Sequence, residues 1–243
     1  MRIWATSDLH LSFANPKPML ELSSKWLGHP ELIPPNWNNV VSKDDIVLIA
    51  GDISWATHFE DAIPDLKFID QLNGTKIIIK GNHDFWWQGK QKLENFTKNM
   101  SIIPLRNNCV QINNISTVGT NIGIVGTRGY NFEYHKEVNV WEISSKHLNR
   151  ELNRLQLSIE DSKEKDIDML IAMIHYPPFA RVNGGESPIT KILEENNIKI
   201  CVYGHIHTIK KHKPPFQGWM NGIRYYYVSC EQYEFYPVLI YEE

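Results

Sequence analysis

The sequence predicts an α/β protein, and three observations carry this prediction. Short apolar runs rich in Ile and Val alternate with longer amphipathic stretches, as in successive strand–helix units. Polar clusters of Gly, Asp, Asn and His directly follow several of these runs. The composition, with 42% hydrophobic and 22% charged residues, is ordinary for a globular chain. No internal repeat or low-complexity tract interrupts the pattern, so we expect one domain over residues 1–243.

The apolar runs predict strands, because β-branched side chains suit a buried, pleated surface. The three isoleucines at residues 77–79 are an example, and they end abruptly in Gly81-Asn82-His83-Asp84. A turn needs Gly and Asn but not the following His and Asp, which points to chemistry at this strand end. The predicted strands cover residues 3–6, 45–50, 76–79, 110–112, 116–118, 122–125, 169–174, 199–203, 224–228 and 238–241.

Three amphipathic stretches predict helices between the strands. Residues 59–72 show helical apolar spacing, and Pro64 places the expected start of this helix near that position. Residues 140–159 carry leucines on one helical face and charged residues on the other. Ser187 and Pro188 open a short helix to Asn196, with Ser187 as the N-cap and Pro188 at the first helical position.

Charge and cysteine usage exclude several classes of protein. A formal net charge of −3 gives no general attraction to nucleic acid or to an anionic membrane, so we expect neither as a partner. Cys109, Cys201 and Cys230 are odd in number and far apart, which argues against a disulfide framework and a thiolate zinc site. No secretory leader and no apolar run of about 20 residues is found. We therefore expect a soluble, cytoplasmic protein with reduced cysteines; its oligomeric state cannot be read from the sequence.

Five predicted strands end in the same kind of polar cluster. In open α/β sheets, ligands bind beyond the carboxyl ends of the strands, so these side chains are predicted to converge. The clusters are Ser7-Asp8-Leu9-His10, Gly51-Asp52, Gly81-Asn82-His83-Asp84, His175-Tyr176-Pro177-Pro178 and Gly204-His205-Ile206-His207.

These clusters offer a ligand set of carboxylates, imidazoles and an amide without cysteine, which suits manganese, iron or zinc. A single catalytic zinc uses about three protein ligands, and the clusters hold more candidates than that. Two ions roughly 3.5–4 Å apart that share a carboxylate would employ the whole set and could clamp both ends of a displacement at phosphorus. The candidates are Asp8, His10, Asp52, Asn82, His175, His205 and His207.

In order and content, the clusters resemble the pattern of the calcineurin-like metallophosphoesterases: Asp-x-His, Gly-Asp, Gly-Asn-His-Asp/Glu, a lone His, and Gly-His-x-His. The resemblance extends from Ser7 to His207. It implies a four-layer αββα sandwich with two mixed β-sheets between helices. It also implies a two-metal phosphohydrolase in which a metal-bridged hydroxide attacks a small phosphoester.

The resemblance assigns a role to each matching residue. His83 would not bind metal but would stand near the leaving-group oxygen, where it would donate a proton or stabilise developing charge. Asp84 would orient His83 through its other ring nitrogen. The first ion would be held by Asp8, His10 and His207, the second by Asn82, His175 and His205, and Asp52 would bridge the two.

The second cluster departs from the protein-phosphatase members of the family. Many of those continue as Gly-Asp-x-x-Asp-x-Gly, whereas residues 51–57 read Gly-Asp-Ile-Ser-Trp-Ala-Thr. Together with Asp rather than Glu at position 84, this favours the bacterial phosphodiesterase-type members. A phosphomonoesterase, a nuclease with a basic groove and a non-catalytic metal-binding scaffold are the alternatives; the scaffold would be expected to have lost ligands, and here every cluster is intact.

Two further features admit a functional and a structural interpretation. Arg128 follows the strand at 122–125 and could bind a phosphate oxygen bidentately, or it could be a surface arginine at a turn. Trp55 and the aromatic residues Phe85, Trp86 and Trp87 lie just beyond predicted metal-bearing loops. They could form a pocket wall for a base or an aryl group, although core packing is the favoured interpretation.

Overall fold

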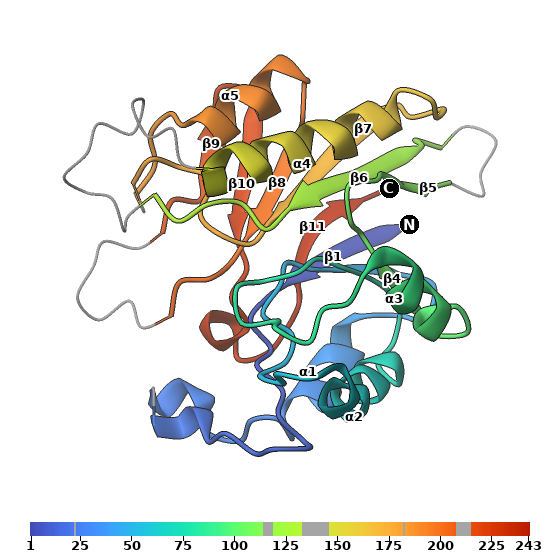
Figure 1. Ribbon diagram of the computed structural model, residues 1–243, viewed down its shortest axis with the longest axis vertical. Helices are drawn as coiled ribbons and strands as arrows, with labels where there is room; N and C mark the ends of the chain where they lie inside the picture. Colours follow the sequence, from blue (N-terminus) through green and yellow to red (C-terminus); the bar gives the residue numbers. More distant parts are fainter. Residues whose placement is uncertain (22, 114–118, 133–145, 182, 208–214) are drawn as a thin grey trace. The chain divides into compact units, whose positions relative to one another are not determined.

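The computed structural model describes residues 1–21, 23–113, 119–132, 146–181, 183–207 and 215–243, which form two compact units (Figure 1). Unit 1 comprises Met1–Pro104 and Val228–Glu243, so the C-terminal segment returns to the N-terminal part of the chain. Unit 2 comprises Leu105–Tyr227. Among the described residues, no helix combines the length and apolar character needed to cross a membrane. The single domain expected from the sequence stays a prediction.

Unit 1 contains a five-stranded mixed sheet in the order β11-β1-β2-β3-β4. The strands β1 to β4 run parallel, and β11 pairs antiparallel with β1. The carboxyl ends of β1, β2 and β3 therefore lie at one edge of the sheet, where the first three polar clusters follow them. The strands are β1 (Arg2–Thr6), β2 (Ile46–Ile49), β3 (Thr75–Ile78), β4 (Ile102–Pro104) and β11 (Val238–Glu242).

The helices of unit 1 share one hydrophobic core with its sheet. Trp37, Leu66 and Leu93, one from each helix, pack in the same cluster as Val47 and Ile78 of the strands. Burying aromatic and aliphatic side chains in this way removes apolar surface from water, the main stabilising term of the fold. The helices are α1 (Ile33–Val40), α2 (Phe59–Asp70) and α3 (Lys90–Thr97), with short 3₁₀ turns η1 (Met19–Glu21), η2 (Ser24–Trp26) and η6 (Cys230–Tyr233).

Unit 2 contains a six-stranded mixed sheet in the order β5-β6-β7-β8-β10-β9. Its four central strands are parallel, and the outer strands β5 and β9 pair antiparallel with their neighbours. The strands are β5 (Val110–Ile112), β6 (Ile122–Thr127), β7 (Met169–Ile174), β8 (Ile200–Tyr203), β9 (Gly218–Met220) and β10 (Ile223–Tyr227).

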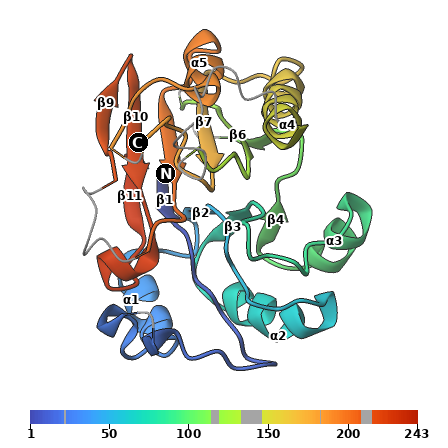
Figure 2. The ribbon, with the colours of Figure 1, turned by 60° about the vertical axis from the view of Figure 1, so that its left-hand side comes forward.

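Two helices, α4 (Lys146–Ser162) and α5 (Pro188–Glu195), cover one face of the unit 2 sheet (Figure 2). Leu155 of α4 and Leu193 of α5 pack in one core cluster with strand residues such as Ala172. Ser187 caps α5 as predicted: its hydroxyl accepts from the backbone N–H of Thr190, and the Thr190 side chain accepts from the backbone N–H of Ser187.

The α/β class with two mixed sheets is confirmed; the stacking of the two sheets stays a prediction. Each predicted strand within the described residues matches an observed strand to within two residues. The predicted strand at 116–118 and the start of the helix at 140–159 lie outside the described residues. The helices α1 and α3 were not predicted, since Pro34 and Pro35 obscure the first and the second is strongly polar.

The predicted start of the helix near Pro64 is wrong. The helix α2 begins at Phe59, directly after His58, and contains Pro64 in its interior. Proline removes one backbone donor from a helix, but Leu66 and Ile69 are fully buried in the core of unit 1. Tertiary packing of the apolar face therefore outweighs the lost hydrogen bond.

Candidate metal centre

The loops that follow β1 and β2 run side by side in unit 1. The backbone N–H of Asp8 donates to the carbonyl of Gly51 at 2.9 Å, and the N–H of His10 donates to the carbonyl of Asp52 at 3.0 Å. These bonds continue the parallel pairing of the strands past their ends. The carboxylates of Asp8 and Asp52 and the ring of His10 are thereby fixed to one another through the backbone.

Several predicted ligands occupy the left-handed region of backbone space. The φ angles are 60° at Asp8, 46° at His10 and 51° at Asp52, and His205 in unit 2 has a φ of 74°. Residues with a Cβ adopt this region at an energetic cost, and such residues cluster at functional sites. Four of the predicted ligands therefore have a strained backbone. This observation does not depend on the motifs, and it supports a functional role for these loops.

The carboxylate of Asp8 is buried and held by two serines. The hydroxyls of Ser7 and Ser229 both donate to its Oδ2, the second at 2.6 Å. The thiol of Cys230 contacts the backbone carbonyl of Asp8 at 3.2 Å, and burial raises the pKa of this thiol well above its usual value, so it stays protonated. The C-terminal segment of unit 1 thus fixes the first predicted ligand.

His10 and Asp52 lie close enough together to bind one ion. Nε2 of His10 is 3.7 Å from Oδ2 of Asp52, and both side chains are about 1% exposed. That distance is longer than a hydrogen bond, but it fits two atoms that each bind one metal at about 2.0–2.2 Å. Trp55 stacks on the His10 ring, with centroids 4.6 Å apart and planes inclined by 23°.

The loop after β3 is tied to the loop after β2. The backbone N–H of His83 donates to Oδ1 of Asp52 at 2.7 Å. Gly81 is required here because a Cβ at this position would lie 2.1 Å from Oδ1 of Asp52. Close approach, rather than an unusual turn, therefore explains the glycine. Asn82 and His83 follow it and are half-buried.

Asp84 is a fully buried carboxylate that organises both loops. Its Oδ1 accepts from the backbone N–H groups of Ile53 and Ser54 at 2.9 and 3.1 Å, and its Oδ2 accepts from the N–H of Gly81 at 2.7 Å. The indole N–H of Trp86 donates to Oδ1 as well, at 2.9 Å. The contact with the His83 ring that the resemblance implies stays a prediction.

Among the aromatic residues near these loops, some belong to the hydrophobic core and others line the site. The sequence left both interpretations open. Trp86 is fully buried and belongs to the core, as favoured. Phe85 is 62% exposed and its ring lies 6.3 Å from that of His83. Trp55 contacts the rings of His10 and His83, the latter at 4.2 Å, and so lines the site itself.

In unit 2, the predicted ligands follow two neighbouring parallel strands. His175 comes directly after β7, and His205 follows β8, with ring centroids 5.2 Å apart. The N–H of Gly204 donates to the carbonyl of His175 at 3.1 Å, which joins the two loops. Tyr176 packs edge-on against the His205 ring at 4.3 Å.

The loop that carries His205 and His207 is held from β10. The hydroxyl of Tyr227 donates to the backbone carbonyl of Ile206, the residue between the two histidines. All three loop residues are half-buried, and the alternation along an extended segment was the signal that singled out both histidines. Tyr227 was not predicted, because nothing near it in the sequence points to the loop.

Arg128 lies at the end of β6, where it has a structural partner. Its guanidinium contacts Oε1 of the buried Glu151 at 3.3 Å, and Arg154 contacts the same oxygen at 2.8 Å. The Arg128 backbone carbonyl accepts from the N–H of His175 at 3.2 Å. Its Nε is buried and makes no hydrogen bond to the described residues. Arg128 therefore adjoins the loop that carries His175, and its contact with a substrate stays a prediction.

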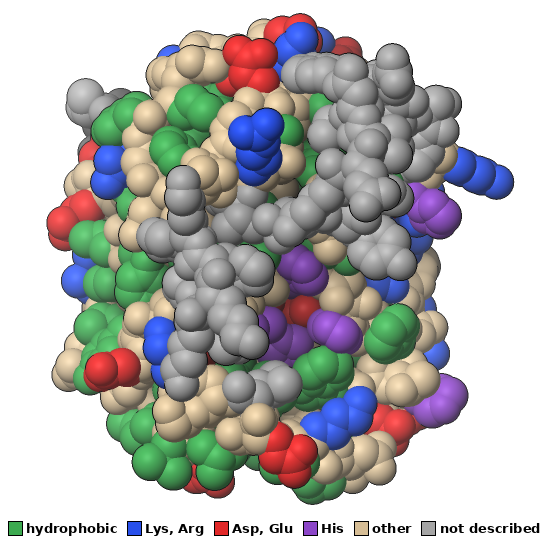
Figure 3. Space-filling model, turned by 90° about the vertical axis from the view of Figure 1, so that its left-hand side faces the viewer, with side chains coloured by type: hydrophobic (Ala, Val, Ile, Leu, Met, Phe, Trp, Pro, Cys, Tyr) green, Lys and Arg blue, Asp and Glu red, His purple; other side chains and the backbone are tan. Residues whose placement is uncertain are grey.

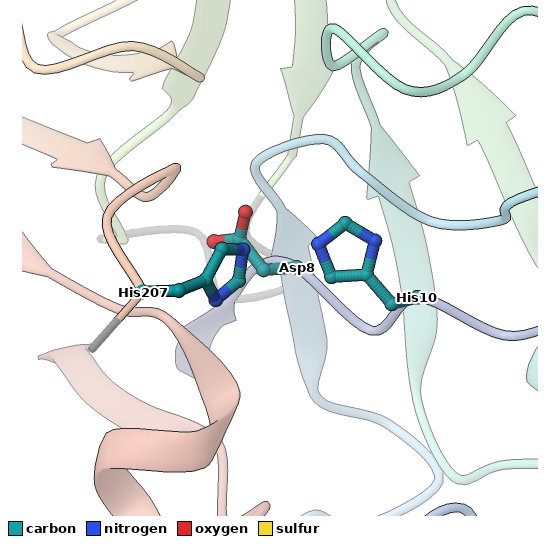
Figure 4. Close-up of side chains that lie close together, drawn as sticks. All are labelled: Asp8, His10 and His207. Carbon is teal, nitrogen blue, oxygen red and sulfur yellow. The ribbon is translucent and has the colours of Figure 1, made fainter. Parts of the chain in front are cut away.

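Two groups of side chains in the described residues are candidates to hold metal ions. Within unit 1, Asp8 and His10 offer ligand atoms within 4.8 Å of each other, as do His175 and His205 within unit 2. Histidine side chains are visible on the face drawn in Figure 3, and Figure 4 shows the side chains of the first group. The first group is Asp8, His10 and His207, and the second is Asp52, His175 and His205.

The donor chemistry of these groups fits metal ions. Buried carboxylates are costly unless they are paired or coordinate a metal, and Asp8, Asp52 and His175 are each fully buried. The atoms offered are carboxylate oxygens and imidazole nitrogens, the borderline ligands that divalent transition metals accept. The free cysteines lie outside both groups, and all three are buried as expected.

The chain matches one family over most of its length. The model of the family described as calcineurin-like phosphoesterase matches residues 1–208. This range contains every predicted ligand.

Two curated proteins are similar over a shorter segment. The chain is 37% identical over 81 residues to the Gene 66 protein of Mycobacterium phage L5 and 31% identical over 87 residues to the uncharacterized protein MJ1445 of Methanocaldococcus jannaschii. These segments cover 33% and 34% of this chain, and 39% and 47% of the relatives. The chain thus spans less than half the length of the curated relatives it matches.

Two solved structures are similar over the whole chain. Phosphopantetheinyl hydrolase (PptH) from Mycobacterium tuberculosis aligns over 100% of this chain and 96% of its own, with a TM-score of 0.60 and 15% identity. The AQ665 protein of unknown function from Aquifex aeolicus aligns over 98% and 95%, with a TM-score of 0.51 and 16% identity. At these identities the likeness shows the fold alone.

Proposed function

We propose that this chain, which belongs to the calcineurin-like phosphoesterase family, is a metal-dependent hydrolase that cleaves small cytoplasmic phosphoesters, with a preference for diesters. The observation that carries the proposal is the pair of candidate metal groups, built from buried carboxylates and imidazoles on strained loops. Two divalent ions in these groups would supply a nucleophile from water and neutralise charge on the phosphoryl oxygens.

The proposed ligands follow the order of the family pattern. Asp52 is proposed to serve both ions, which its 3.7 Å separation from His10 supports. Manganese, iron and zinc are the proposed metals, since the mixed oxygen and nitrogen donor set lies within the range that these metals accept. One ion would be held by Asp8, His10 and His207, and the other by Asn82, His175 and His205.

His83 is the proposed proton donor to the leaving-group oxygen. Its backbone is fixed by the bond to Asp52, and its half-buried ring lies against Trp55. A positioned general acid contributes typically 100- to 10,000-fold, and it matters most when the leaving group is a poor one. We therefore expect His83→Ala to lose about 100-fold or more with an alkoxide leaving group and clearly less with p-nitrophenolate. Equal losses for both leaving groups would remove His83 from this role.

The preference for diesters is supported by the second and third clusters. Residues 51–57 lack the continuation typical of the protein-phosphatase members, and Asp84 replaces the glutamate of many of them. Asp84 accepts hydrogen bonds from four N–H groups of the unit 1 loops, so it holds these loops in place in addition to its proposed role of orienting His83.

The first experiment removes bound metal, restores Mn²⁺ and compares the hydrolysis of a diaryl phosphodiester with that of its monoester. Bound metal is counted in the same samples. We expect a higher kcat/KM for the diester. A higher value for the monoester would assign the protein to the phosphomonoesterases, and no hydrolysis of either with metal bound would indicate a scaffold.

A further inference from the structure

Unit 1 contains a pocket of about 600 Å³, which is lined by residues of the segment that connects β1 to α1. The segment that forms it carries η1 and η2 and is drawn in blue in Figure 1. Its volume is in the range of small-molecule sites. The lining is mainly apolar and includes Phe13, Pro16, Met19, Leu20 and Trp26. Its polar members are Ser12, Lys17, His29 and Glu31.

The wall of this pocket touches the predicted site. The Trp26 ring lies edge-on to the His10 ring at 6.0 Å. The indole N–H of Trp55 donates to the sulfur of Met19 at 3.0 Å, and Trp55 itself stacks on His10. Of the two lining residues, Trp26 therefore contacts the candidate ligand His10 itself, and Met19 contacts Trp55, which stacks on His10.

Lys17 adds a positive charge at the same place. Its Nζ lies 4.8 Å from the centroid of the Trp55 ring, and its side chain is exposed to solvent. A cation held over an indole face is attracted by the ring quadrupole. A phosphoryl oxygen near His10 would therefore have a cation and an apolar cavity beside it.

The pocket is anchored to the rest of unit 1. The N–H of Phe13 donates to the buried Asp65 of α2 at 2.9 Å. A ring nitrogen of His29 contacts the carbonyl of Leu9 at 2.7 Å. A largely preformed cavity loses little conformational entropy when it is filled.

We propose that this pocket receives the apolar arm of the phosphoester substrate, an alkyl or aryl group of roughly five to eight carbons, with Lys17 beside the phosphoryl group. The inference rests on the proposed function and narrows its substrate class to phosphoesters that carry one apolar arm. The cavity is larger than a methyl or ethyl ester requires, and most of its lining residues are apolar, which favours an apolar group over a sugar.

Binding of ethyl-, butyl- and hexylphosphonate to the manganese-loaded protein tests the proposal by isothermal titration calorimetry. These ligands share one phosphonate group and differ only in the arm. Burial of a methylene is worth up to about fourfold in affinity, so we expect Kd to fall about two- to fourfold per added carbon. Hydrolysis of bis(p-nitrophenyl) phosphate is measured in parallel as the readout of the proposed function.

Leu20→Asp is the test variant, because Leu20 is 51% exposed and lines the pocket, so a carboxylate there leaves the fold intact. Leu157→Asp is the matched control, since Leu157 is 46% exposed on α4 and lies outside the pocket. We expect the dependence on arm length to vanish in Leu20→Asp and to persist in Leu157→Asp.

The outcomes separate the two proposals. Equal affinity for all three phosphonates, or an unchanged dependence in Leu20→Asp, would overturn the pocket assignment while diester hydrolysis stands. The absence of both phosphonate binding and hydrolysis would overturn the proposed function and this inference with it.

Discussion

The two units hold their candidate ligands in different ways. Besides the imidazole of His10, unit 1 supplies two carboxylates, Asp8 and Asp52, and both accept hydrogen bonds from serine hydroxyls or backbone N–H groups. Unit 2 supplies imidazoles, His175 and His205, which are placed by ring contacts with Tyr176. A buried anion needs hydrogen-bond donors around it, whereas an imidazole ring can be positioned by packing.

We expect the carboxylates of unit 1 to contribute most of the metal affinity. Carboxylates carry the negative charge that balances a divalent cation, and removal of one also leaves its hydrogen-bond donors without an acceptor. Imidazoles contribute a coordinate bond but no charge. We therefore expect substitutions of the unit 1 carboxylates to reduce metal binding more than substitutions of the unit 2 imidazoles.

The largest effect is expected for Asp52→Asn. The amide keeps the shape of the side chain and an oxygen for the His83 N–H, but it loses the charge proposed to serve both ions. Loss of metal-derived stabilisation of several kcal/mol corresponds to about 1,000-fold or more in kcat/KM. Turnover of the diester and metal bound per chain, by elemental analysis, measure this effect.

His205→Asn is the matched variant in unit 2. It also exchanges one donor for an amide, and we expect it to retain more metal and more turnover than Asp52→Asn. If the two variants lose metal equally, charge is not what distinguishes the units. If His205→Asn loses more metal and more turnover than Asp52→Asn, the imidazoles of unit 2 contribute more to metal binding than the carboxylates of unit 1.

The next effect is expected for Asp84→Asn, which tests whether the unit 1 loops depend on an anion that binds no metal. The new amide N–H₂ would face N–H donors of Gly81 or Ile53 in a buried setting. Loss of charge-assisted bonds costs about 1.5–3 kcal/mol each, so we expect a loss of about 3 kcal/mol in the free energy of unfolding. Urea unfolding measures it. Asp44→Asn, at an exposed position, should leave stability within about 0.5 kcal/mol.

The sequence predicts the candidate ligands of both units but not the groups that hold them in place. Asp8, His10 and His205 stand in short motifs at strand ends, so local pattern and the rule for α/β sheets located them. Ser229 and Tyr227 reach the site loops from distant parts of the chain, and one hydroxyl in a sequence carries no sign of its partner. The prediction of secondary structure from the apolar runs was wrong at Pro64. Core packing there outweighs the tendency of proline to begin or break a helix.

A smaller effect is expected for Tyr227→Phe, which tests the packing of the unit 2 loop. It removes one neutral hydrogen bond to the carbonyl of Ile206, worth about 1 kcal/mol, and should weaken metal binding by about tenfold. Metal titration and thermal unfolding measure the two quantities.

Tyr225→Phe is its control on the same strand. The Tyr225 hydroxyl is buried and has no hydrogen-bond partner among the described residues, so its removal should leave stability unchanged or raise it. Metal affinity should not change. Equal behaviour of the two variants would show that the Tyr227 bond does not position the loop.

The contrast between the units extends to buried charges away from the ligands. In unit 2, Glu151 is balanced by Arg128 and Arg154. In unit 1, Lys76 of β3 is fully buried, and its Nζ donates to the carbonyls of Leu72 and Gly74 and to the hydroxyl of Ser101. Burial lowers the pKa of Lys76 from 10.5 to about 8, and the nearby Asp70 carboxylate offsets part of this shift.

The smallest expected effect follows from this pKa and concerns the pH dependence of stability. Between pH 8 and 10.5 the unfolded chain keeps a proton on Lys76 that the folded protein has released, so the free energy of unfolding should rise with pH in this interval. Lys76→Met lacks this titration. Thermal unfolding from pH 7 to 10 should therefore show the wild type gaining stability relative to Lys76→Met above pH 8, by no more than a few degrees in Tm. Lys43→Met, at an exposed position, should run parallel to the wild type. Parallel curves for Lys76→Met as well would mean that the carbonyl oxygens hold the Lys76 ammonium as well as water does, and that unit 1 accommodates a buried cation without cost.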